Sequence, residues 1–412
     1  MRWIVSRLET EGYETWAVGG AVRDALLGHP SGDWDLATRA PPEEVRRLFR
    51  RTVPVGVEHG TVGVLAREGT LYEVTTFRRD VETTGRHAVV AFAETLAEDL
   101  ARRDFTVNAI AWHPVRGEWA DPHGGAADLE RRRLRTVGEP GERFAEDYLR
   151  VLRALRFAGR FGLEVAPGTW SALCAAVPHL GRLSSERVRE ELWKVLAGDA
   201  TPARSLELYR RSGALAALYP ELARVAEASG AAGDEGAAGE GRGSAPEGAA
   251  APAWDRTLAV LTAVRRHRPL LRLAVLLGEV GSPPPHPDDP PLTPDGRDAA
   301  DPARARGRVR SAAVLTRLRH ANRQVATVSE LVGIGPQDRE RPPAVLLVDL
   351  GGQARGDAVF LEEHDEVADV PVLGPGAPDL LELDLADALD LAEPVGVLVQ
   401  DLDRLRAEGP DD

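Results

Sequence analysis

Two aspartates near the N-terminus stand at a spacing that suits a divalent cation. Asp33 and Asp35 form an Asp-x-Asp pair in the run 33–38, which has the composition of a strand. Side chains at positions i and i+2 of a strand project from one face, so the two carboxylates would repel each other unless a cation joined them. Mg²⁺ is the natural candidate, because it takes oxygen ligands from carboxylates and phosphates. A solvated strand face is the alternative for an Asp-x-Asp pair that stands alone.

A glycine pair and an arginine precede the aspartates at a spacing that suits a phosphate. Gly19 and Gly20 end a predicted strand at 14–18 and allow a ligand to approach the backbone, and the helix that follows offers its free N–H groups. Arg23 is expected in the first turn of that helix, where the dipole disfavours a cation, so an incoming anion would explain it. A tight turn alone would account for the glycines. Their combination with Arg23 and the aspartate pair favours a metal-assisted phosphate site.

Two further groups are candidates for the same site. Glu73 lies in a predicted strand over 70–77. If that strand pairs beside the strand of the aspartates, Glu73 would complete the site and help to activate an attacking hydroxyl, whereas a surface glutamate is the equally open alternative. Arg103 is predicted to clamp a triphosphate, because a planar guanidinium binds phosphate oxygens in pairs. Its neighbour Asp104 is predicted to cap the segment that follows.

A second constellation lies in the helical sequence EDYLRVLRALRFAGRF, residues 146–161. Asp147 and Arg150 are three residues apart and are predicted to share one helix face, which Arg153 and Arg156 continue. Because Asp only accepts hydrogen bonds and Arg only donates them, the pair matches the pairing edges of cytosine and adenine, and not those of uracil or guanine. An exposed ion pair of little energetic value is the alternative.

The elements that must position these residues change character along the chain. Short runs rich in Val, Thr and Tyr, with turn residues between them, predict a small mixed α/β domain ending near residue 135. The predicted strands are 14–18, 33–38, 61–66 and 70–77, and the predicted helices are an N-terminal amphipathic one, 22–27, 41–51 and 94–103. From 143 to 222 the spacing of apolar residues becomes helical.

Composition excludes several classes of protein. No apolar run approaches the ~20 residues of a membrane span, and the first residues lack a signal peptide's apolar core, so we expect a cytoplasmic protein with no membrane contact. The single cysteine, Cys174, excludes a disulfide framework and a cysteine-built zinc site. Although the net charge is -14, residues 131–222 carry 16 Lys and Arg against 11 Asp and Glu. A polyanion is therefore predicted to dock on the middle of the chain.

Two stretches contain too few large apolar residues to form a core. Residues 224–253 are rich in Gly, Ala and Glu, and residues 281–308 in Pro and Asp, so both are expected to be flexible insertions. The predicted units are a head at 1–135, a helical neck at 136–222, an insertion at 223–253, a helical body piece at 254–280, an insertion at 281–308, and a helical body with an acidic tail at 309–412.

As an ordered set, the motifs resemble the bacterial class II tRNA nucleotidyltransferase and poly(A) polymerase family. The resemblance covers the chain to about Leu222 and is carried by GGAVRD…DWD, YEVTTFRRD, RRDFTVNAIA, DPHGG, EDYLRVLRALRF and SSERVREEL. It implies an α+β fold, with a mixed-sheet nucleotidyltransferase head of the DNA polymerase β-like superfamily followed by helical neck, body and tail. It implies that Asp33 and Asp35 hold Mg²⁺. The residues implied to bind incoming ATP or CTP are Gly20, Arg23, Arg103, Asp147, Arg150, Arg153 and Arg156.

Three departures from the family pattern bear on the activity. The segment RRDVETTGRHAVVAF (78–92) is shorter than the family's loop and lacks its aromatic residue and Arg-His-Pro ending, and that loop helps to switch nucleotide choice in the family. DPHGG has His123 where the family usually places Phe. Residues 254–280 resemble the start of an HD-type phosphohydrolase, but its diagnostic His-Asp positions hold Gly278 and Glu279, so no second hydrolase activity is expected.

The sequence therefore predicts template-independent addition or repair of the 3′-terminal CCA of tRNA from CTP and ATP, with pyrophosphate release. The basic stripe at 131–211 would follow the acceptor-stem phosphates in a salt-dependent manner. A CC-adding enzyme, an A-adding enzyme and a poly(A) polymerase remain open: the shortened loop favours a narrower activity, whereas VPVGVEHGTVGVL (53–65) is more like the CCA-adding branch. A catalytically silent RNA-binding protein and a small-molecule nucleotidyltransferase are the rivals from other classes. The oligomeric state stays open.

Overall fold

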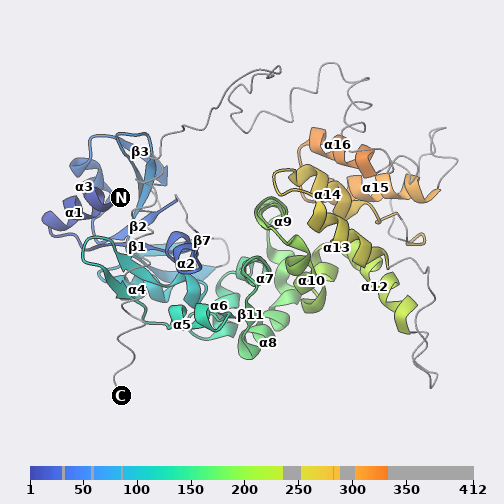
Figure 1. Cartoon of the computed structure of the whole chain (residues 1–412), viewed down its shortest axis with the longest axis horizontal. Helices are drawn as coiled ribbons and strands as arrows, with labels where there is room; N and C mark the ends of the chain where they lie inside the picture. The colour runs from blue at the N-terminus through green and yellow to red at the C-terminus, as the bar shows by residue number, and fades with distance from the viewer. Residues whose placement is uncertain are drawn as a thin grey trace, which may run out of the picture.

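A computed structural model shows how the chain is arranged. It describes residues 1–29, 33–56, 60–84, 87–234, 252–281, 283–287 and 302–332. Figure 1 shows a sheet-containing head at one end of the molecule and a succession of helices leading away from it. The α+β class, with a mixed-sheet head followed by helices, is confirmed.

The head is built on a seven-stranded sheet with the strand order β3-β4-β5-β2-β1-β8-β9. Its strands are β1 (Thr15–Val18), β2 (Asp35–Thr38), β3 (Thr52–Gly56), β4 (Thr61–Leu65), β5 (Leu71–Thr76), β8 (Ala111–His113) and β9 (Glu118–Ala120). β2 and β5 run parallel, and the other neighbouring strands run antiparallel. The sequence located β1, β4 and β5 within one residue at either end, but it did not predict β3, β8 or β9.

Helices cover the sheet on both faces. On one face α1 (Arg2–Thr10), α2 (Gly20–Leu26) and α3 (Pro42–Leu48) bury apolar side chains in the same cluster as Leu36 and Val74. On the other face α4 (Leu96–Ala101) packs through Leu100 in a cluster with Ala37. Along β5 alternate side chains are buried, which leaves Glu73 exposed. Because β-strand side chains alternate between faces, Asp35 and Ala37 project toward the face that α4 partly covers.

The segment that departs from the family pattern forms a hairpin. β6 (Arg78–Thr84) and β7 (His87–Phe92) pair antiparallel as a separate two-stranded sheet, with a register shift between Asp80 and Glu82. The sequence predicted no strands here. The pairing begins directly where β5 ends, so the hairpin is attached beside the strand that carries Glu73.

Helices make up most of the remaining described chain. They are α5 (Gly125–Glu130), α6 (Pro140–Glu146), α7 (Leu149–Phe161), α8 (Pro167–Ala176), the 3-10 helix η3 (Val177–Arg182), α9 (Ser185–Gly198), α10 (Pro202–Ser212), α11 (Ala214–Leu218), α12 (Pro220–Asp234), α13 (Ala253–Ala263), α14 (Pro269–Leu277), α15 (Pro302–Arg317) and α16 (Asn322–Val332). One hydrophobic cluster contains Leu36 of the head, Leu155 of α7 and Leu273 of α14. The head, neck and body therefore share a continuous core.

Two helices extend into segments expected to be flexible insertions. α12 continues to Asp234 and buries Val225 and Ala226, and α15 begins at Pro302 and buries Ala305. The expectation was wrong at these edges, because alanine-rich sequence has high helix propensity and needs only a small apolar contact to dock on neighbouring helices. Residues 235–251 and 288–301, the centres of the two insertions, lie outside the described residues, as does the acidic tail from 333 onward. No helix in the described part is long and apolar enough to cross a bilayer.

Candidate active site

Asp35 and Glu73 face each other on adjacent strands. β2 and β5 pair in parallel, and their register makes Asp35 and Glu73 Cα partners. Both residues are exposed. The strand of Glu73 therefore lies beside the strand of Asp35, which was the condition for Glu73 to serve as a third carboxylate.

Asp33 differs from its expected position. β2 begins at Asp35, so Asp33 lies in the segment before the strand, and the predicted strand over 33–38 was wrong by two residues at its start. A shared direction of the two carboxylates stays a prediction. The strand is shorter than expected because β1, its antiparallel partner, also ends where Val18 pairs with Asp35. Asp33 nevertheless acts on Asp35. Desolvation by the surrounding protein is the largest cause that raises the pKa of Asp35, which reaches about 6, and repulsion from Glu73 and Asp33 adds to it. The positive charge of Arg103 opposes the shift.

The arginine predicted to clamp a triphosphate lies beside this carboxylate. Nη1 of Arg103 is 3.1 Å from the position that a Cβ on Gly19 would occupy, and Oδ2 of Asp35 is 3.8 Å from it. Gly19 also has φ +78°, a conformation that favours glycine. Arg103 is held by Asp99 at 3.0 Å and by the main-chain carbonyl of Asn108 at 3.3 Å. Gly19, Asp35 and Arg103 thus meet at the start of α2.

The carboxylates fit a hard cation as a partial ligand set. Within the part of the chain that the structure describes, no three His, Cys, Asp or Glu side chains form a complete metal-binding group. Asp35 instead offers an exposed carboxylate whose ionisation is opposed by two neighbouring negative charges. Mg²⁺ is commonly held by one or two carboxylates together with substrate phosphates. The donor set is therefore of the kind that a metal–triphosphate complex would complete.

Arg23 is buried rather than open to a ligand. α2 begins at Gly20, so Arg23 lies beyond the first turn, contrary to expectation. Its guanidinium donates to Asp24 at 2.8 Å and to the Asn108 side chain at 2.5 Å, and it lies 4.4 Å from the centroid of the Phe161 ring. Burial lowers the pKa of Arg23, against the opposing effect of Asp24. These internal partners explain its position, so no external anion is needed to account for it.

Asp104 joins the head to the neck. Its carboxylate accepts from the Phe105 N–H at 2.8 Å and from the Asn108 side chain at 2.9 Å. The predicted capping role was wrong, because the short 3-10 helix that follows, Thr106–Asn108, has no side-chain cap and Phe105 stands at its N-cap position. Nε of Arg153 donates to the same carboxylate at 2.7 Å. Burial opposes ionisation, but Arg153 and Asn108 hold the pKa of Asp104 below its ordinary value. Arg153 therefore ties α7 to the segment that carries Arg103.

Asp147 and Arg150 were predicted to share one helix face, but Asp147 lies outside α7. Asp147 has extended backbone angles between α6 and α7, because its carboxylate accepts from the Leu149 N–H at 3.0 Å and so caps α7. The carboxylate also binds Arg187 of α9 at 2.7 Å. Arg150, in the first turn of α7, donates to Glu146 and, at 2.9 Å, to the main-chain carbonyl of Arg143. Both predicted base-reading residues therefore have protein partners in this structure.

Arg156 lies inside the neck. Its Nε donates to Glu191 of α9 at 2.8 Å, and the two side chains are only 6% and 1% exposed. Its guanidinium is 4.3 Å from the centroid of the Phe157 ring. Burial opposes the ionisation of Glu191, but Arg156 and Lys194 hold its pKa below the ordinary value. The Arg156–Glu191 pair therefore fixes α7 against α9.

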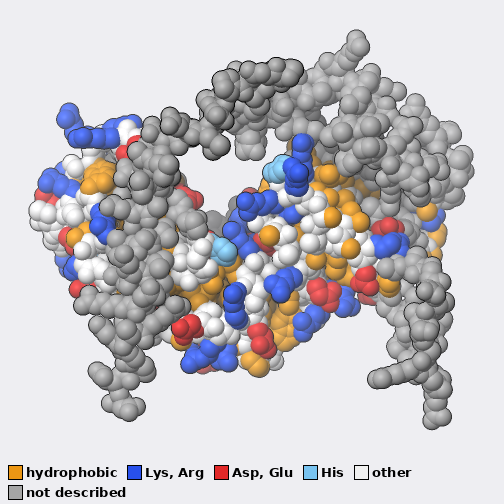
Figure 2. All heavy atoms as spheres, viewed as in Figure 1, with side chains coloured by type: hydrophobic (Ala, Val, Ile, Leu, Met, Phe, Trp, Pro, Cys, Tyr) orange, Lys and Arg blue, Asp and Glu red, His pale blue; other side chains and the backbone are white. Residues whose placement is uncertain are grey.

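Sequence reasoning missed several partners that hold the site. Asp99 and Asn108 orient Arg103, Asn108 also binds Arg23, and Glu191 neutralises Arg156. Asn108 had a signal, because it lies within the RRDFTVNAIA segment. Figure 2 shows Lys and Arg side chains gathered over the neck helices beside the hollow next to the head, where the basic stripe was expected.

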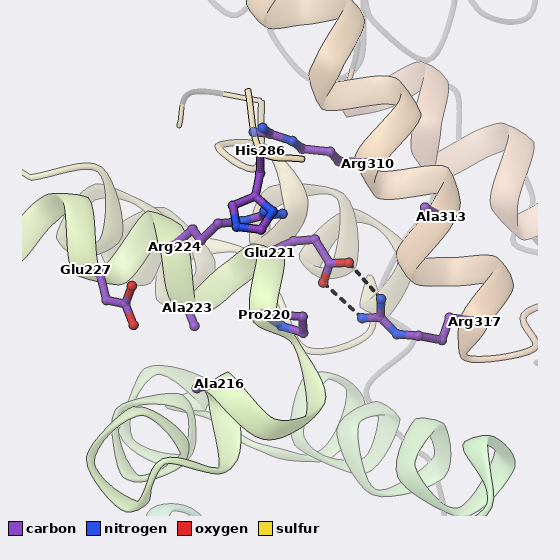
Figure 3. A pocket seen from close by; sticks show the side chains of 10 residues that line it. All are labelled: Ala216, Pro220, Glu221, Ala223, Arg224, Glu227, His286, Arg310, Ala313 and Arg317. Atoms are coloured by element: carbon purple, nitrogen blue, oxygen red, sulfur yellow. Dashed lines mark hydrogen bonds and ion pairs between the residues drawn. The ribbon is translucent and has the colours of Figure 1, made fainter. Parts of the chain in front are cut away.

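A separate hollow of about 410 Å³ lies in the body, between α12 and α15 (Figure 3). Arg317 of α15 crosses it to bind Glu221 of α12 with two contacts, at 2.7 and 2.9 Å. His286 and Arg310 also line it. None of the predicted site residues lines this hollow, so it is distinct from the carboxylate site of the head.

Two family models match the chain: the poly A polymerase head domain over residues 15–135, and the probable RNA and SrmB-binding site of polymerase A over residues 162–225. The crystal structure of the Bacillus stearothermophilus CCA-adding enzyme in complex with CTP is 32% identical, with a TM-score of 0.52. The match covers 86% of this chain and 91% of that one. The chain belongs to the class II poly(A) polymerase and CCA-adding enzyme family.

Curated members of the family match its first half. The CCA-adding enzyme of Geobacillus thermodenitrificans is 48% identical over 226 residues, which is 54% of this chain and 55% of that protein. That of Geobacillus stearothermophilus is 47% identical over 222 residues, 53% of this chain and 54% of that protein. The match thus spans about half the length of these curated relatives. A tRNA nucleotidyltransferase solved with a primer tRNA and an incoming ATP analogue has a TM-score of 0.51 at 22% identity, which shows a shared fold.

Proposed function

We propose that this family member adds or repairs the 3′-terminal CCA of tRNA, using CTP and ATP and releasing pyrophosphate. The observation that carries the proposal is the register of β2 and β5, which makes Asp35 and Glu73 neighbours beside Gly19 and Arg103. The relatives named CCA-adding enzymes, at 48% and 47% identity over the half of the chain that contains this site, support the same reaction.

In the proposed reaction the RNA 3′-oxygen bonds to the α-phosphorus while the bond to the leaving pyrophosphate breaks. Mg²⁺, held by Asp33 and Asp35, would lower the pKa of the attacking hydroxyl and neutralise charge on the triphosphate. Glu73, the Cα partner of Asp35, would take the proton that the hydroxyl loses. Arg103, which lies near Asp35 at Gly19, would bind triphosphate oxygens, as would the main chain at Gly20, where α2 begins. The chain's contribution is positioning and charge neutralisation.

We assign base choice to Asp147 and Arg150. Asp147 would accept from the exocyclic amino group of cytosine or adenine, and Arg150 would donate to the adjacent ring nitrogen. Both side chains must first exchange their partners, Arg187 and Glu146, for the base. Arg153 and Arg156, also predicted to bind nucleotide, are bound to Asp104 and Glu191, and we assign them the positioning of α7. Arg23, bound to Asn108 and Asp24, is assigned the same kind of role for α2.

A narrower product is the second candidate. The β6–β7 hairpin is formed by residues 78–92. This segment is shorter than the family's loop, which helps to switch nucleotide choice. In a CC-adding enzyme the head and neck would be intact, but the β6–β7 hairpin would not support the addition of A. The same observation fits an A-adding enzyme or a poly(A) polymerase less well, because Asp147 and Arg150 match both bases.

The test is product length on a tRNA that ends before its CCA. Purified protein with Mg²⁺ is given CTP, ATP, or both, and the products are separated at single-nucleotide resolution. The proposal predicts two added residues with CTP alone and three with both nucleotides. Two residues under both conditions identify a CC-adding enzyme, and a long A tail identifies a poly(A) polymerase. No addition to any RNA 3′ end contradicts the proposal.

A further inference from the structure

Three neck side chains that are not among the predicted site residues lie close together. The Tyr148 ring lies 5.1 Å from the His179 ring, with 34° between the ring planes. The Arg182 guanidinium lies 5.7 Å from the centroid of the Tyr148 ring. Tyr148 precedes α7, whereas His179 and Arg182 belong to η3. We refer to these three residues as the Tyr148 cluster.

The Tyr148 cluster is open to solvent. His179 and Arg182 are exposed, and Tyr148 is half-buried. The same 3-10 helix, η3, buries Val177 and Leu180 in the core. Burial of these two apolar residues anchors η3. It does not explain why the His179 imidazole and the Arg182 guanidinium lie against the Tyr148 ring at the surface.

The Tyr148 cluster adjoins the predicted base-reading residues. Asp147 is the preceding residue, and its carboxylate is fixed by the Leu149 N–H on one side of Tyr148 and by Arg187 of α9. Arg182 is the last residue of η3, and Arg187 lies five residues later, in the first turn of α9. The Tyr148 cluster and the Asp147 carboxylate are therefore held by neighbouring parts of the neck: residues 147–148 before α7, and the stretch from η3 into α9.

We propose that the Tyr148 cluster binds an unpaired base of the RNA substrate, with the His179 and Tyr148 rings stacking on the base and Arg182 contacting the adjacent phosphate. This inference rests on the proposed function. Splayed, unpaired bases stack on aromatic rings and guanidinium planes, and such stacking tolerates any base because every base has a π-face. That tolerance suits a growing 3′ end, since the base beside the incoming nucleotide changes at each addition.

The test compares two RNAs that differ only in an unpaired tail. The affinity of the protein for an acceptor-stem minihelix with an unpaired 3′ tail ending in C-C is divided by its affinity for the same helix with a blunt end. We expect Tyr148→Ala and His179→Ala to lower this tail-dependent gain roughly 5- to 10-fold, toward the lower end of base–aromatic stacking. Tyr148→Phe keeps the ring and is expected to keep the gain.

A second cation–ring pair on the neck provides the matched control. Arg211 lies 5.5 Å from the centroid of the Trp170 ring, in another part of the neck. Arg211→Ala likewise removes one side chain from a contact with an aromatic ring on the neck, and it should leave the tail-dependent gain unchanged. The affinity for CTP, measured without RNA, should be the same in all variants, which checks that the neck remains folded.

An unchanged tail-dependent gain in Tyr148→Ala overturns the inference. So does an equal loss of affinity for tailed and blunt RNA, because that result indicates a general effect on charge or folding. Both affinities are equilibrium measurements that need no turnover. Failure of the wild-type protein to add C or A is therefore a separate result, which contradicts the proposed function itself.

Discussion

The head and the neck hold their charged residues in opposite ways. In the head, the backbone register of β2 and β5 brings Asp35 next to Glu73, and Asp33 adds a further negative charge. Like charges are held together there. Desolvation, followed by repulsion from the neighbouring carboxylates, raises the pKa of Asp35 to about 6. This arrangement weakens the metal-free protein but prepares it to accept a cation.

In the neck, three of the arginines of α7 already have carboxylate partners. Arg150 binds Glu146, and the more buried Arg156 binds Glu191. Charges of opposite sign are held together there, so the neck is stabilised before any ligand arrives. Substitutions at the head carboxylates are therefore expected to damage the reaction while sparing the fold. Substitutions at the buried neck pair should do the reverse.

The largest expected effect is on the rate after substitution of Asp35. Asp35→Asn removes the charge that would hold Mg²⁺ but keeps the size of the side chain, so addition of the first C to tRNA should slow by about 10³-fold or more. Single-turnover incorporation measures this rate. Glu43→Gln, which alters an exposed carboxylate on α3, is the control and should leave the rate unchanged. A rate for Asp35→Asn within tenfold of wild type would contradict the assignment.

The next effect is on stability, in the neck. Glu191→Ala leaves Arg156 buried without its carboxylate, and removal of one partner of a buried pair lowers the free energy of unfolding by about 3–5 kcal/mol. Urea denaturation measures the change. The double variant Arg156→Met with Glu191→Leu removes both charges and should recover much of the loss. If Glu191→Ala unfolds at the same urea concentration as wild type, the pair does not hold α7 against α9.

A smaller effect is expected on base choice. Arg150→Ala removes the proposed donor to the ring nitrogen, so preference for C and A over U and G should fall by about 10- to 100-fold, the value of one hydrogen bond to a charged group. Incorporation of each nucleotide, supplied singly, measures this preference. Arg160→Ala, which alters an exposed arginine on the same helix, is the control. Unchanged preference in Arg150→Ala would show that other residues read the base.

The smallest effect is a pH-dependent gain in stability at the head. The folded pKa of Asp35, about 6, lies above the unfolded value, so its ionisation opposes folding increasingly as pH rises from about 4 to 6. Without Mg²⁺, Asp35→Asn should therefore be more stable than wild type at pH 7.5 and equal to it near pH 4. Because the residue is exposed, solvent screening limits the gain to about 1 kcal/mol. Urea unfolding in EDTA at the two pH values measures it, and a lower stability of Asp35→Asn at pH 7.5 would contradict the repulsion.

Local patterns were sufficient to predict β1, β4 and β5 of the head and most of β2. The alternation of apolar and polar residues in β5 and the residue types around Asp35 predicted these two strands. Glu73 was predicted to join the site if the two strands paired. The parallel pairing of β2 with β5 depends on contacts between distant parts of the chain, so the register itself was beyond the sequence. Short strands such as β8 and β9 carry too few residues for a two-residue period to be recognised.

The neck shows where sequence reasoning failed. A helical period predicted that Asp147 would share a face with Arg150, but Asp147 instead caps α7 with an extended backbone. Aspartate competes for backbone N–H groups at helix starts, and that choice depends on where the preceding helix ends. Likewise, Glu191 gave no sign that it would be buried, because its partner Arg156 is 35 residues away.

The most direct test of the head as a cation-assisted triphosphate site is the binding of CTP, without RNA, by isothermal titration calorimetry with and without Mg²⁺. The wild-type protein should bind CTP more tightly when Mg²⁺ is present, and Asp35→Asn should show little or none of this gain. The Glu191 and Arg156 double variant, which keeps the head intact, should retain it. An equal Mg²⁺-dependent gain in the wild-type protein and in Asp35→Asn would contradict the central claim.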